Sequence, residues 1–192
     1  NFGYIVLGKI IEEASGRSYQ DFVKENIFEK LKMTDTGYDV KSKVIASRAS
    51  GYSWDEGKLI NANYDDMSEL MAVGGIYSTT EDLHRWIRAL FAGELLSDSS
   101  LAQMTTAYKD NAGLGVFIQT VSGNRKIWHN GSMSGFHSFI AYYPDIDATI
   151  IVLSNVEGNQ TEVVARELEF VLLDMNVVLP SEWIEVSLTE DD

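Results

Sequence analysis

Apolar residues recur at helical spacing through the first part of the chain. This spacing predicts a first helix over residues 4–14, which Ser15-Gly16 is expected to end. Ser18 is expected to cap a second helix, with Asp21 as its capping-box partner. The expected buried face of the second helix consists of Tyr19, Phe22, Val23, Ile27 and Leu31.

Helix signals return after a long stretch without periodicity. Residues 34–73 are rich in Asp, Ser, Gly and Asn, which predicts either a surface segment or loops around a site. Ser78-Thr79-Thr80-Glu81 is a helix start, and the apolar residues between Leu83 and Phe91 follow it at helical spacing. Ser97 is expected to cap a shorter helix.

The pattern changes after Gly113, where strands are expected. The predicted strands are joined by turns at Ser122-Gly123-Asn124 and Pro144-Asp145. The last one is a continuous apolar run, typical of a strand that is covered on both faces. The predicted strands are Val116 to Val121, Lys126 to His129, Phe136 to Tyr143 and Thr149 to Leu153.

A final helix is predicted over residues 160–175, and the tail from Asn176 is expected to fray toward Glu190-Asp191-Asp192. Helices come first, an antiparallel meander follows, and a helix packs after it. That order argues for an α+β fold. The residues expected to face inward from the final helix are Val163, Val164, Leu168, Val171 and Leu172.

Composition excludes several classes of function. The chain has 192 residues, 45% of them hydrophobic, which is enough to bury a sizeable core. Its 29 acidic and 15 basic residues give a net charge of −14, so neither nucleic acid nor an anionic membrane surface is an expected partner. There is no Cys, which excludes disulfides, thiolate metal sites and a Cys nucleophile, and fits an exported protein as well as a cytosolic one.

Of the three histidines, His129 has the neighbours that suggest a site. None of the three has metal-ligand spacing, and no cofactor motif is present, so no metal or cofactor is expected. Trp128 to Ser132 ends a predicted strand in small and polar residues, where Gly131 lets a ligand approach the backbone. A His there can donate a proton or bind an anion. A functional His129 and a simple hairpin turn stay equally open on these residues alone.

Several segments form a pattern when they are taken in order. Asn1-Phe2-Gly3-Tyr4 opens the chain, and His129-Asn130-Gly131 lies in its second half. These two segments and four others occur in the order found in class C β-lactamase-like and D,D-peptidase-like serine hydrolases. The chain resembles that family over residues 1–155 and the helix that follows. The other matching segments are Leu31 to Gly37, Gly74-Gly75-Ile76-Tyr77-Ser78-Thr79-Thr80-Glu81-Asp82-Leu83, Gly135-Phe136 and Leu153-Ser154-Asn155.

The resemblance implies a truncated β-lactamase/transpeptidase-like fold. Residues 1–112 would then be part of the helical domain. Residues 113–175 would be the last sheet strands and the packing helix of the α/β domain, and residues 176–192 would be a tail. It also implies an exported or cell-envelope parent protein.

In that family the Ser of a Ser-x-x-Lys motif attacks a carbonyl and forms an acyl-enzyme, assisted by the Tyr of Tyr-x-Asn. The chain contains neither motif. Asn1 matches the Asn of Tyr-x-Asn, so the missing Tyr would stand two residues before Asn1, and a truncation is expected there.

The resemblance gives roles to the residues that remain. Asn1 would hydrogen-bond the substrate amide or the catalytic Lys, and His129 would orient the substrate carboxylate or pass a proton, where other members carry Lys. The backbone N–H of Ser132 would be one of two oxyanion donors. Asn130 and Gly131 would bind substrate, with Gly131 keeping the strand edge open.

Three hypotheses remain, and the weakest of them is that the chain is an unrelated acidic α+β domain. The first is a fragment of a serine hydrolase for β-lactams, D-Ala peptides or esters, inactive by itself. The second is a non-catalytic relative that keeps the cleft as an interaction module. The resemblance also places absent strands beside Thr149 to Leu153. A bare strand edge recruits other chains, so self-association through this strand is expected unless the upstream part is supplied.

Overall fold

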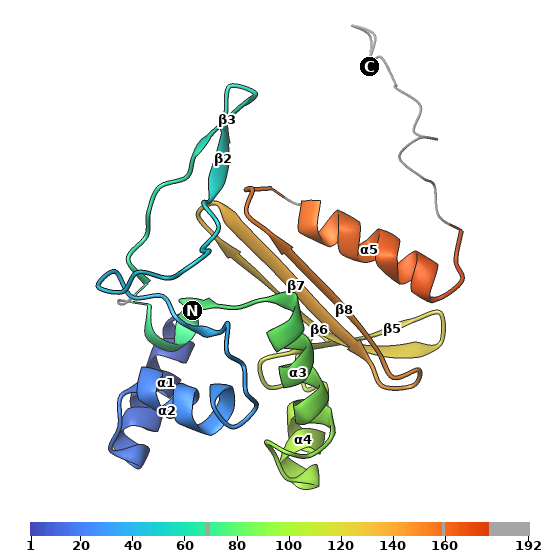
Figure 1. Cartoon of the computed structure of the whole chain (residues 1–192). Coiled ribbons are helices and arrows are strands. Elements are labelled where there is room, and N and C mark those ends of the chain that lie inside the picture. Colours follow the sequence, from blue (N-terminus) through green and yellow to red (C-terminus); the bar gives the residue numbers. More distant parts are fainter. Residues whose placement is uncertain (68–69, 159, 177–192) are drawn as a thin grey trace, which may run out of the picture.

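The two predicted N-terminal helices are present in the computed structural model, which describes residues 1–67, 70–158 and 160–176 (Figure 1). Helix α1 spans Phe2–Ser15 and ends at Gly16 in the left-handed conformation, with φ 69°. Helix α2, Tyr19–Val23, is capped by Ser18, whose side chain accepts from the Asp21 N–H. It continues into a π-helical turn, η1, Lys24–Phe28. Most of the predicted tail lies outside the described residues.

The segment that was predicted to be irregular contains short strands. Strand β1, Gly37–Tyr38, pairs with β4, Ile76–Tyr77, and η3, Met71–Val73, packs against α1. The expectation missed a hairpin between β2, Tyr52–Asp55, and β3, Lys58–Asn61. Its two-residue turn is Glu56-Gly57, and both residues have positive φ, which suits the twist of paired strands.

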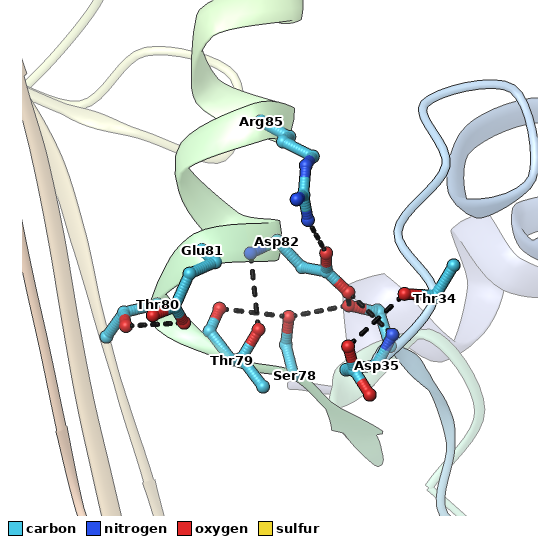
Figure 2. A network of polar contacts seen from close by, with 9 residues as sticks. Thr34, Asp35, Ser78, Thr79, Thr80, Glu81, Asp82 and Arg85 are labelled. Atoms are coloured by element: carbon cyan, nitrogen blue, oxygen red, sulfur yellow. Dashed lines mark hydrogen bonds and ion pairs between the residues drawn. The ribbon is translucent and has the colours of Figure 1, made fainter.

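Helices α3, Thr80–Phe91, and α4, Asp98–Met104, begin where the sequence predicts, with Thr79 and Ser97 as their caps. A fully buried carboxylate, that of Asp82, joins α3 to the turn after α2. It accepts hydrogen bonds from the Asp35 N–H at 2.9 Å and the Thr36 hydroxyl at 2.8 Å, and it pairs with Arg85 (Figure 2).

The second half of the chain forms a four-stranded antiparallel sheet in the order β5-β6-β7-β8. Helix α5, Gln160–Leu172, packs on one face of the sheet, and α3 packs on the other. The prediction that the last strand is covered on both faces is confirmed. The strands are β5, Phe117–Val121, β6, Asn124–Met133, β7, Phe136–Tyr143, and β8, Ala148–Ser154.

The predicted inward face of the last helix is wrong. The residues of α5 that are buried against the sheet are Thr161, Ala165 and Glu169, whereas Val164 and Leu168 are 45% exposed. Val171 and Leu172 are also exposed, and Val163 is only half-buried. The hydrophobic pattern failed because a polar cluster, rather than an apolar stripe, fixes the rotation of this helix.

That polar cluster lies between α5 and the sheet. The Lys126 ammonium lies 2.7 Å from the Glu169 carboxylate, and the Tyr143 hydroxyl donates to the same carboxylate at 2.6 Å. All three side chains are buried. Burial, and next the hydrogen bond to Glu169, raises the pKa of Tyr143, so this hydroxyl stays a donor.

Replacing Asp82 should detach α3 from the turn at Asp35. Asp82→Ala leaves the Asp35 N–H and the Thr36 hydroxyl without their acceptor, so we expect the free energy of unfolding to fall by about 3 kcal/mol. The neighbouring Glu81→Ala is the control, because Glu81 is exposed, and it should change stability by less than about 0.5 kcal/mol. Equal urea midpoints for the two variants would contradict this role.

Removing Glu169 should leave a buried, unpaired ammonium. For Glu169→Ala we expect a loss of about 3–5 kcal/mol in the free energy of unfolding, measured by urea denaturation. The double variant Lys126→Met/Glu169→Leu removes both charges and should recover most of that loss. A double variant as unstable as the single one would show that packing, not the unpaired charge, is responsible.

Candidate functional site

The second half of β6 has an open edge. Strand β5 pairs with β6 only as far as the Phe117–Trp128 pair, whereas β7 pairs with β6 to the Met133–Phe136 pair. Within the described residues, no strand therefore lies beside the outer edge of His129 to Met133. The residues that sequence analysis placed in the site, apart from Asn1, all lie on this strand.

The register shows which backbone groups face the open edge. Both neighbours of β6 are joined to it by two-residue turns, Ser122-Gly123 and Ser134-Gly135. Residues that flank such a turn form a hydrogen-bonded pair, and hydrogen-bonded pairs then recur at every second residue. Both turns give the same answer for β6: the N–H and C=O groups of Asn130 and Ser132 point outward, while those of His129 and Gly131 point to β7.

The side chains of these residues divide between the two faces of the sheet. His129 and Gly131 face α3, and His129 lines an apolar cavity of about 150 Å³ with residues such as Trp86 and Ile140. The His129 ring stacks on Phe117, with 5.5 Å between centroids. Its Nδ1 lies 2.5 Å from the Asn130 carbonyl oxygen, which can only accept, so Nδ1 carries the proton and Nε2 remains for a ligand.

Asn130 and Ser132 direct their side chains toward α5 instead. The Asn130 amide donates to Glu162 Oε1 at 2.9 Å. The Ser132 hydroxyl lies 3.5 Å from His137 Nε2, which also accepts from the Gly158 N–H at 3.2 Å. Both residues therefore present backbone, and not side chain, to the open edge.

Gly131 lies opposite Ser138, and a Cβ built on Gly131 would lie 2.6 Å from Ser138 Oγ. This contact is closer than real Cβ atoms make. A side chain at position 131 would therefore require the Ser138 hydroxyl to move.

Asn1 is exposed at the start of α1, and its side chain makes no capping hydrogen bond. Two contacts bring its surroundings toward β6. The Tyr4 hydroxyl approaches Gly115, which lines the same cavity as His129, and Gly74, which follows η3, approaches the Met133 sulfur. None of the polar contacts given for the described residues joins Asn1 itself to β6.

Sequence reasoning missed two residues that shape the site. Phe117 stacks on His129, and Glu162 holds Asn130. The first could not have been found from the hairpin register, because that register places Phe117 opposite Trp128 and not opposite His129. The second carries no sequence signal. Among the described residues, no cluster of three His, Asp or Glu side chains could hold a metal ion.

Comparisons with known proteins agree on one family. The family model described as "Beta-lactamase" matches residues 1–173. The chain is 29% identical to a putative penicillin-binding protein, PbpX, of Bacillus subtilis and 30% identical to penicillin-binding protein 4* of the same organism, covering 81% and 82% of this chain. In each case it spans only 39% of the relative.

A solved structure gives the same result for the fold. The octameric penicillin-binding protein homologue of Pyrococcus abyssi superposes with a TM-score of 0.82 at 28% identity. The superposition covers 91% of this chain and 42% of that one.

Gly131→Ala should destabilise the sheet through one identified contact. We expect a loss of about 1–3 kcal/mol in the free energy of unfolding, because the new methyl group meets the Ser138 hydroxyl. Ser138→Ala removes that oxygen, so Gly131→Ala in this background should be much milder. Strictly additive effects in the double-mutant cycle would rule out the contact as the cause.

Proposed function

The chain belongs to the β-lactamase family, and on that premise we propose that it is the carboxy-terminal portion of a serine hydrolase. The proposed substrates are β-lactams, peptides that end in D-Ala, or small esters, which are hydrolysed through an acyl-enzyme. The observation that carries the proposal is the open edge of β6, where outward backbone groups lie beside His129.

The edge can bind an acyl substrate in an extended conformation. The outward N–H of Ser132 would donate to the oxyanion that forms at the attacked carbonyl, and one such donor is worth roughly 3 kcal/mol of transition-state stabilisation. The Asn130 backbone groups would pair with the substrate main chain, as in strand addition. Gly131 presents no side chain that could interfere with this approach.

His129 would act on the substrate carboxylate. Because its Nδ1 is bonded to the Asn130 carbonyl, its Nε2 is the atom that would donate to the carboxylate when the ring is protonated. Stacking on Phe117 fixes the plane of the ring. Asn1 is proposed to contact the substrate amide or the catalytic Lys.

The chain by itself is proposed to be inactive. It has no Ser-x-x-Lys and no Tyr-x-Asn, and without a nucleophile the covalent route is closed. The Ser132 hydroxyl does not replace it in this proposal, because it points to the α5 side of the sheet. Among the described residues, no strand lies beside the outer edge of Thr149 to Leu153. Self-association through this edge is proposed for the chain when the upstream part is not supplied.

Acylation tests the proposal directly. When the chain is incubated with a penicillin, intact-mass measurement should show no adduct. When it is joined to the product of the coding sequence directly upstream of Asn1, one penicillin mass should appear, on a Ser of a Ser-x-x-Lys motif.

Other outcomes would decide against parts of the proposal. An adduct on a Ser of this chain would overturn its inactivity. An upstream sequence without the two motifs would overturn the hydrolase and favour the non-catalytic interaction module. In the joined protein, His129→Gln should lower kcat/KM for a carboxylate substrate by roughly 10- to 100-fold, with the exposed His84→Gln as the control.

A further inference from the structure

The backbone of Ser132, the proposed oxyanion donor, points away from β7. The pairs on either side of it, those of Gly131 and Met133, are hydrogen-bonded to β7 in the register given above. Ser132 therefore lies opposite His137 in a non-hydrogen-bonded pair, in which the two side chains approach each other closely. The contact between these side chains is the polar contact that ties Ser132 to the neighbouring strand.

The partners of His137 determine where its ring carries a proton. Its Nε2 accepts from the Gly158 N–H at 3.2 Å. A backbone N–H can only donate, so Nε2 carries no proton, and the proton of the neutral ring is on Nδ1. The Ser132 hydroxyl, 3.5 Å from the same Nε2, is then the donor in that contact. One imidazole nitrogen thus joins the end of β6 to the segment that leads into α5.

The segment that carries Gly158 is itself held by strand β2. The Tyr52 N–H donates to the Asn155 carbonyl at 2.9 Å, and the Glu157 N–H donates to the Tyr52 carbonyl at 2.8 Å. These two bonds fix the backbone on the amino-terminal side of Gly158. The Gly158 N–H is therefore a fixed point against which the His137 ring is oriented.

We propose that His137 is a positioning residue for the oxyanion donor of the proposed function, on which this inference rests. Through Nε2 it holds the Ser132 side chain on the α5 face of the sheet. This contact fixes the direction of the Ser132 N–H at the open edge, where no strand among the described residues restrains it. Direction matters, because an oxyanion donor acts only when it is aimed at the place where charge develops.

Replacing the acceptor tests this role in the joined protein. His137→Phe removes Nε2, and kcat for a chromogenic ester should fall by roughly 10- to 100-fold, the effect of a displacement of about 1 Å. KM should change little, because acylation and deacylation use the same donor. The exposed His84→Phe is the matched control and should leave kcat within about twofold.

A conservative variant separates positioning from a loss of packing. The amide oxygen of His137→Gln can accept in place of Nε2, so this variant should recover most of the kcat that His137→Phe loses. Equal kcat values for the two variants would overturn the proposal, whether both are natural or both are reduced.

A double-variant cycle tests the route through the Ser132 hydroxyl. Ser132→Ala removes the hydroxyl and keeps the backbone N–H, so it should lower kcat about as much as His137→Phe does. The double variant should then be no slower than His137→Phe alone. Additive losses would show that His137 does not act through Ser132 and would overturn the proposal.

Two measurements distinguish the failure of this inference from the failure of the proposed function. Nitrogen NMR of the His137 ring should show a protonated Nδ1 and a bare Nε2, and a proton on Nε2 would overturn the positioning role whatever the activity. If penicillin acylates the natural joined protein but His137→Phe keeps its kcat, only this inference fails. If penicillin does not acylate the natural joined protein, the proposed function fails and the role of His137 falls with it.

Discussion

The arrangement of the site depends on the register of β6, which two turns fix independently. The turns at Ser122-Gly123 and Ser134-Gly135 each contain only two residues, so each one sets which residues of β6 form hydrogen-bonded pairs. Because both settings agree, the outward direction of the Asn130 and Ser132 backbone is over-determined. A shift by one residue would exchange these groups with those of His129 and Gly131 and would turn every side chain to the other face.

The same alternation explains how one short segment can serve two purposes. On the α3 face, the side chains of Ile127 and His129 line the apolar cavity. On the other face, Asn130 contacts Glu162 of α5, and Ser132 contacts His137 of β7. These polar side chains hold the strand and leave its outward backbone groups free for the proposed pairing with substrate.

Several elements could be predicted from local signals. The caps at Ser18, Thr79 and Ser97 and the turn at Ser122-Gly123 depend on neighbouring residues alone, and the structure confirms them. The rotation of α5 could not be predicted. Its apolar residues suggest one inward face, but the Lys126–Glu169 pair and the Tyr143 hydroxyl hold another face against the sheet. The side chains of Val164, Leu168 and Val171 on α5 remain exposed for that reason.

The sequence by itself determined the family, the order of the elements and the candidate site residues of β6. Those features are carried by motifs and by periods of two and 3.6 residues, which are local along the chain. Only the tertiary structure decided which side of the sheet each of those residues faces, how closely Gly131 approaches the Ser138 hydroxyl, and which face of α5 packs against the sheet. These features depend on groups far apart in sequence, and their relative positions follow from strand pairing and packing, which no local pattern records.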